Sequence, residues 1–106
     1  MGSKTSSKTV EKEICLPPNG KRPQVTYRLC RQTADTVNGH PGKENAFCFS
    51  LCCETADECA VAHDLTTERA KAERWFAILI AGEVTPAVFY EILEELFAQE
   101  AYEAFR

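Results

Sequence analysis

The stretch GEVTPAVFYEILEELF (residues 82–97) carries the clearest structural signal in the chain. Thr85 can cap a helix with its side-chain oxygen. Pro86 suits the first helical position, because its φ is already helical and its missing N–H would have no partner there. Apolar residues then recur at helical spacing, at Phe89, Ile92, Leu93, Leu96 and Phe97. A helix therefore begins at Pro86, with one apolar face.

Residues 66–81 predict a second helix just upstream. Thr66 can be its N-cap, and Gly82 stands where a C-terminal glycine belongs. From residue 75 to residue 81 the helix is apolar on every side, which a helix with one face in water would not be. It therefore either lies between a sheet and the second helix or shows part of its surface to another subunit.

The half of the chain before the helices alternates between apolar and polar residues, as half-buried strands do. Val25, Tyr27 and Leu29 share one face of the clearest strand. Strands are expected over residues 24–31, 46–53 and 59–65, with a shorter one at 13–16. Turn-forming residues separate them. The fold class is therefore α+β, an antiparallel three- or four-stranded β-meander followed by two C-terminal α-helices packed on it.

Length and composition indicate one domain. A chain of 106 residues leaves no room for a second core. We expect a flexible tail over residues 1–12 and a single α+β domain over residues 13–106. The longest apolar run has seven residues, whereas a bilayer needs roughly 20. The first residues, MGSKTSSKTVEKE, lack the apolar segment of a secretory signal. These features predict a cytoplasmic protein with reduced thiols.

Charge is distributed unevenly along the chain. Residues 1–31 carry seven basic and two acidic side chains, whereas residues 32–106 carry five basic and fourteen acidic ones. A broad phosphate-binding face needs many Lys and Arg side chains. We therefore expect no nucleic-acid partner.

The order of these elements resembles a family of short bacterial proteins known only as a domain of unknown function. The resemblance covers roughly residues 25–97. It rests on the Tyr27-x-Leu29 strand, on Asp64-Leu65-Thr66-Thr67 before the first helix, and on Val84-Thr85-Pro86 before the second. It implies an intracellular α+β fold, and it implies no activity and no functional residue.

Six cysteines are the most unusual feature of the composition. No Cys-x-x-Cys pair occurs, and Cys48 and Cys52 would lie ~13 Å apart along one strand, too far to share a zinc ion. Cys30 could approach Cys48 or Cys52 across neighbouring strands. A metal-binding or redox-responsive protein that uses Cys30, Cys48 and Cys52 is therefore the alternative function. Otherwise the cysteines are packing residues, with Cys53 and Cys59 on the core face.

Catalytic chemistry is not predicted. Cys–His catalysis needs a thiol beside an imidazole that a third group orients. His63 and Asp64 are adjacent on a strand and point to opposite faces, and His40 lies in a Gly/Pro-rich loop. The glycines form no phosphate-binding loop. We expect no enzyme and no cofactor.

Binding is therefore the leading hypothesis. The partner-binding candidates are Trp75 and Ile78 on the first helix, and Glu91, Glu94 and Glu95 on the second. Acidic residues continue to Glu100 and Glu103, with only Arg106 to balance them locally. The sequence predicts a small interaction or regulatory module that binds a protein partner or forms a homodimer through the first helix.

No membrane partner is expected. Met1-Gly2-Ser3-Lys4-Thr5-Ser6 fits the pattern for N-myristoylation at Gly2, which is kept as an alternative. A single acyl chain anchors a protein only marginally. The same first residues also resemble the start that expression vectors leave on a protein.

Overall fold

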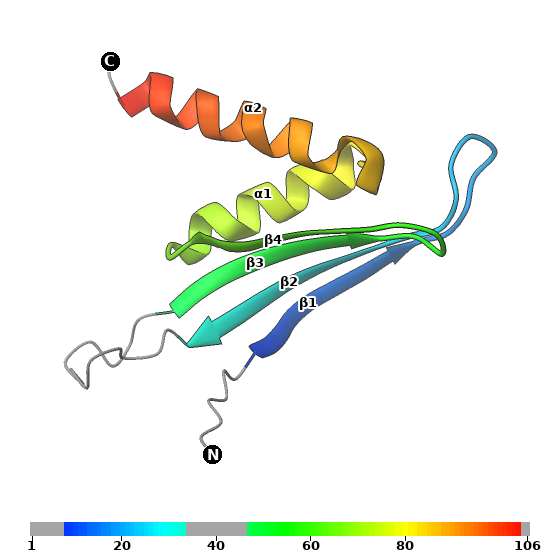
Figure 1. The fold of residues 1–106 in the computed structure, drawn as a ribbon, viewed down its shortest axis with the longest axis horizontal. Coiled ribbons are helices and arrows are strands. Elements are labelled where there is room, and N and C mark those ends of the chain that lie inside the picture. Colours follow the sequence, from blue (N-terminus) through cyan, green and yellow to red (C-terminus); the bar gives the residue numbers. More distant parts are fainter. Residues whose placement is uncertain (1–7, 34–46, 105–106) are drawn as a thin grey trace.

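A computed structural model describes residues 8–33 and 47–104, which form one antiparallel sheet and two helices (Figure 1). The elements are β1 (Lys8–Leu16), β2 (Val25–Thr33), β3 (Phe47–Glu54), β4 (Cys59–Thr66), α1 (Arg69–Ala81) and α2 (Pro86–Ala104). The strand order is β1-β2-β3-β4, so each strand pairs with its neighbour in the chain. The predicted α+β class is confirmed, with four strands in the meander.

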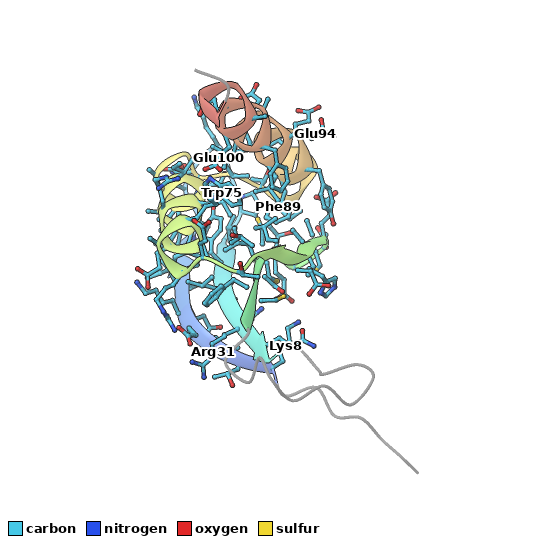
Figure 2. All side chains as sticks on the ribbon, turned by 90° about the vertical axis from the view of Figure 1, so that its left-hand side faces the viewer. Lys8, Arg31, Trp75, Phe89, Glu94 and Glu100 are labelled. Atoms are coloured by element: carbon cyan, nitrogen blue, oxygen red, sulfur yellow. The ribbon has the colours of Figure 1, made fainter. Side chains whose placement is uncertain are left out.

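Both helices lie on the same face of the sheet, and none of the described helices covers the other face (Figure 1). Figure 2 shows Trp75 and Phe89 pointing into the interior of this two-layer arrangement. The largest fully buried side chains come from the two central strands, β2 and β3, and from both helices. They are Tyr27, Phe49, Phe89, Leu29, Leu51, Leu79, Val25 and Cys53.

The first strand is longer than predicted. It begins at Lys8, so residues 8–12 belong to the sheet and not to a tail. Thr9 pairs with Arg31, and a bulge follows between Val10 and Lys12. Polar residues can occupy this strand because it lies at the edge of the sheet, where most of its side chains are exposed. Apolar alternation, the signal used to find strands, is therefore absent from residues 8–12.

A cluster of charges joins the start of β1 to α1. Arg69 at the start of α1 donates hydrogen bonds to both carboxylate oxygens of Glu11. Arg31 on β2 lies 3.2 Å from the same carboxylate. The hydrogen bond from Arg69 lowers the pKa of Glu11. The bulged residue thus connects two strands to a helix, which no local pattern could show.

The ends of α1 differ in detail from the prediction. Thr66 belongs to β4, and Glu68 occupies the N-cap position with no side-chain cap bond. The Thr66 hydroxyl instead accepts a hydrogen bond from the Glu68 backbone N–H at 3.1 Å. Strand pairing to β3 extends through Thr66 and therefore delays the helix.

Gly82 is the C-cap of α1, as predicted. The backbone N–H groups of Glu83 and Val84 donate to the carbonyls of Ile80 and Leu79, each at 3.0 Å, in a Schellman arrangement. The left-handed position, with φ of 51°, falls on Glu83 and not on the glycine. The Glu83 carboxylate accepts from Arg22 Nε at 2.9 Å, which helps to hold this residue in place.

The first residues of β4 direct the opposite set of side chains toward the core from the set that was predicted. Ala60 is only 2% exposed and points into the core, whereas Cys59 is exposed. Small side chains suit this position, since α2 packs closely over β4. Further along β4, the pairing becomes irregular opposite Phe49 and Leu51, and Asp64 has a φ of 52°. This irregularity changes which side chains of the strand point toward the core. The expectation that Cys59 lies on the core face is wrong.

Candidate functional site

Trp75 is a core residue. Its side chain is 3% exposed, and its ring meets Phe97 edge-on with centroids 5.2 Å apart. Lys71 Nζ lies 5.9 Å from the centre of the same ring. The indole therefore holds α1 against α2, and the prediction that Trp75 contacts a partner must be corrected. An apolar run in a helix cannot by itself distinguish a helix–helix contact from a subunit contact.

Ile78 keeps a free surface, with 37% of the residue exposed. It belongs to a stripe of exposed residues that runs along α1 at helical spacing. The members of this α1 stripe are Ala70, Arg74, Ala77, Ile78 and Ala81. One face of the first helix is thus buried between the sheet and the second helix, and another is largely apolar and uncovered within the protomer, while its contact with another subunit stays a prediction.

A groove of about 540 Å³ lies next to this stripe, between β1 and α1. Its apolar wall includes Ile14, which is 41% exposed, together with Ala77, Ile80 and Ala81. Lys12 stands at its rim, where its ammonium lies 3.9 Å from the Glu73 carboxylate. We call this the β1–α1 groove.

The two edges of the sheet are protected in different ways. At the β4 edge, the Tyr90 hydroxyl accepts from the Val61 backbone N–H at 3.1 Å and donates to the Val61 carbonyl at 3.0 Å. This side chain from α2 occupies groups that an added strand would need. The β1 edge has charged residues and the bulge at Glu11 in place of such a cap.

The acidic side of α2 is exposed to solvent. Glu91, Glu94 and Glu95 are all exposed, with Glu94 on the outside of the helix (Figure 2), and none of them makes an ion pair with another described residue. Glu100 differs, because Lys71 and Arg74 of α1 lie 2.8 and 3.2 Å from its carboxylate. The expectation that only Arg106 balances this end of the helix therefore fails for Glu100.

The helix-free face of the sheet carries most of the cysteines. Cys30 is 6% exposed and pairs with Ser50, so Cys48 and Cys52 lie diagonally on either side of it. Within residues 8–33 and 47–104, no three His, Cys, Asp or Glu side chains are grouped to hold a metal ion. Cys30, Cys48 and Cys52 therefore share a face without forming a ligand set.

Two of these cysteines have other neighbours. Burial raises the pKa of Cys48, and the charge of Asp64 raises it further. Burial raises the pKa of Cys52 and the nearby Cys59 raises it further, whereas Arg28 lowers it. Sequence reasoning missed Cys59 as a surface thiol because it placed this residue on the core face.

Several further predictions concern the remaining residues. His63 is exposed at the surface. His40, Gly2 and Arg106 lie outside the described residues. No described helix is long and apolar enough to cross a membrane.

The resemblance to a family of short bacterial proteins over residues 25–97 stays a prediction. No family model, curated protein or solved structure that was compared with the chain matches it.

Proposed function

We propose that the protein is a small interaction module that forms a homodimer through α1. The observation that carries this proposal is the position of Ile78, an exposed apolar side chain next to the β1–α1 groove. Apolar side chains gain free energy when a partner removes them from water. Burial of the α1 stripe against a partner would therefore favour association.

A second copy of the chain fits this surface because a knob and a groove lie side by side on it. In a two-fold dimer both copies use the same surface patch to form the interface, so each contact between two residues occurs twice. Ile78 of each copy can then enter the groove of the other, beside Ile14. Ala77 and Ala81 flank this contact, and their small side chains allow two helices to approach closely.

The contact is proposed to be made by side chains and not by strand addition. Charged residues and bulges on an edge strand oppose pairing with another strand. β1 has Lys8, Glu11, Lys12 and Glu13 in nine residues, with the bulge at Glu11. The α1 stripe carries one charged side chain, Arg74, which Glu100 of the same protomer already binds.

Only a weak dimer is expected from this surface. Full burial of an isoleucine contributes about 1.5–3 kcal/mol, so covering the exposed third of Ile78 or Ile14 contributes ~0.5–1 kcal/mol. Counted in both copies, the two isoleucines supply ~2–4 kcal/mol. A micromolar complex needs about 8 kcal/mol, and the alanines and the groove wall must provide the rest. Self-association should therefore depend on concentration in the micromolar range.

We also propose that the protein works in the cytoplasm. The cysteines in the described residues are free, and Cys15 and Cys59 are exposed. Exposed free thiols persist in a reducing compartment and oxidise in the secretory pathway.

The test is sedimentation velocity over a wide concentration range for three proteins. Ile78→Arg places a charge in the proposed contact and should give a monomer at every concentration. Val88→Arg is the matched control, because Val88 is 39% exposed on α2, outside the proposed contact. It should dimerise like the unchanged protein. Circular dichroism should show all three folded.

A monomer at every concentration for the unchanged protein would refute the proposal. Equal loss of dimer in the Ile78 and Val88 variants would place the contact elsewhere.

A further inference from the structure

The structure places two thiols together on the helix-free face of the sheet. Cys52 on β3 pairs with Val61, and Glu54 on the same strand pairs with Cys59. Cys52 and Cys59 are therefore diagonal neighbours across one antiparallel pair. Their adjacent residues Cys53 and Ala60 are buried in the core, so both thiols project from the opposite face.

We infer that Cys52 and Cys59 form an oxidation site, in which a hydroperoxide converts the two thiols into a reversible disulfide. The inference is independent of the proposed homodimer, since the α1 stripe lies on a helix that covers the other face of the sheet (Figure 1). The bond would form within one chain.

The two cysteines have different parts in this chemistry. Cys59 is exposed at the first position of β4 and is open to an oxidant. Cys52 is only partly exposed, and burial raises its pKa, with the nearby Cys59 raising it further. The Arg28 guanidinium, which pairs with Cys52 across β2 and β3, favours the Cys52 thiolate. Cys59 is thus the thiol that attacks the oxidant first, and Cys52 is the thiol that then attacks the oxidised Cys59.

Arg28 is held rigidly beside Cys52. Its Nε donates to the Glu13 carboxylate at 2.9 Å and its Nη1 donates to Glu54 at 2.7 Å. These bonds span three strands and fix the guanidinium over the sheet face. A cation held next to a thiol is a common feature of reactive cysteines.

The remaining thiols within the described chain are poorly placed to compete. Cys53 donates to the Val84 carbonyl at 3.3 Å inside the core, and Cys30 is buried. Cys48 lies against Asp64. Cys15 is exposed on β1, but Thr26 and Glu54 separate it from β4 in the same row of the sheet. Three strand spacings amount to ~14 Å.

Closing the disulfide requires a small movement of the backbone. Diagonal Cα atoms in an antiparallel pair lie ~7–8 Å apart, and disulfides join Cα atoms up to about 6.8 Å apart. Cys59 directly follows the turn formed by residues 55–58, where a strand end can move most easily. A disulfide that closes against strain is also easier to reduce, which makes this one reversible.

The reaction balances with one hydroperoxide. The Cys59 thiolate attacks one peroxide oxygen, the O–O bond breaks, and a sulfenic acid forms while the leaving oxygen takes a proton and departs as water or an alcohol. The Cys52 thiolate then attacks the sulfenic sulfur, the S–O bond breaks, and the leaving hydroxide is protonated to water. The sulfur pair loses two electrons and the peroxide gains two. A cellular thiol reverses the change by exchange.

The experiment uses the full-length protein, fully reduced and then treated with one equivalent of hydrogen peroxide. Remaining thiols are alkylated, and the chain is cleaved after its Glu residues, which separates Cys52 from Cys59 at Glu54 and Glu58. The expected product is the peptide of residues 45–54 linked to the peptide of residues 59–68. Non-reducing electrophoresis of the uncleaved protein should show a monomer band, because the disulfide joins two cysteines of one chain.

Two variants make the result specific. Cys52→Ser should abolish the linked peptide and let the Cys59 sulfenic acid accumulate, which a dimedone adduct detects. Cys15→Ser is the matched control, since it removes an exposed thiol of the same face, and it should leave the linked peptide unchanged.

A linked peptide that persists in Cys52→Ser would overturn the inference, because another thiol would then be the partner. So would a link found only between two chains, or a Cys59 that gives sulfinic acid without any disulfide in the unchanged protein.

Discussion

Replacing Tyr27 by Phe removes a single hydroxyl from the centre of the core. Tyr27 is fully buried, and its hydroxyl donates to the backbone carbonyl of Val84 at 2.7 Å. The same carbonyl accepts from Cys53 Sγ at 3.3 Å, so the variant leaves it with one donor. We therefore expect a loss of about 1 kcal/mol in the free energy of unfolding, the net value of a neutral hydrogen bond. An unsatisfied buried carbonyl would cost up to ~3 kcal/mol.

The pH dependence of the stability difference between the two proteins gives a second test of the role of the Tyr27 hydroxyl. Burial raises the pKa of Tyr27 to about 12 from its ordinary 10.0, and the charges of Cys53 and Glu83 add to the effect. Because the folded pKa is above the unfolded one, this stabilisation is complete below pH 10 and is lost as the pH rises toward about 12. A pKa difference of that size corresponds to at most ~2.7 kcal/mol. The phenylalanine variant has no ionisable hydroxyl at this position, so it does not lose stability in this way.

Cys53 titrates over a similar range, since burial raises its pKa from 9.0 to about 12. Cys53 is present in both proteins, so the difference between them reports Tyr27 together with its interaction with Cys53. Urea unfolding followed by the fluorescence of Trp75, the single tryptophan, measures both stabilities between about pH 7 and about pH 11. The gap of about 1 kcal/mol should shrink above about pH 10. A difference in the free energy of unfolding of only a few tenths of a kcal/mol at neutral pH, or a difference that stays constant with pH, would refute the reasoning.

Three further predictions concern single side chains. Glu83→Gly should be more stable than Glu83→Ala by about 1 kcal/mol in chemical denaturation, because both lose the pair with Arg22 but only glycine adopts a φ of 51° without strain. Tyr90→Phe should speed hydrogen exchange at the Val61 amide, and unchanged exchange would mean that the β4 edge is not capped by the hydroxyl. Trp75→Ala should cost about 3–5 kcal/mol in thermal unfolding followed by circular dichroism, whereas a residue that only contacts a partner would cost the monomer little.

Much of the fold follows from patterns that act over short distances. Alternation at Val25, Tyr27 and Leu29 was enough to predict a strand and its buried face. Pro86 marked the start of α2, because its ring permits only the first turn of a helix. Gly82 marked the end of α1. These signals need no tertiary contact, since they depend on the backbone preferences of a few neighbouring residues.

Parts of the candidate sites were also visible in the sequence. Ile78, Glu91, Glu94 and Glu95 were predicted as partner-binding residues, and the structure leaves all four exposed. Alternation also placed Cys48 and Cys52 on the same face of β3, which the strand pairing confirms. Cys59 was missed, because alternation defines two faces of a strand without saying which one meets the core.

The sequence by itself therefore determined the order of the elements, most of their boundaries and the α+β class. Tertiary structure alone decided that Trp75 packs on Phe97, that Glu100 binds Lys71 and Arg74, and that Cys59 lies beside Cys52. The physical reason is the range of the forces involved. Backbone preference and hydrophobic periodicity act within one turn or one strand, whereas burial and ion pairing depend on whichever distant segment packs alongside.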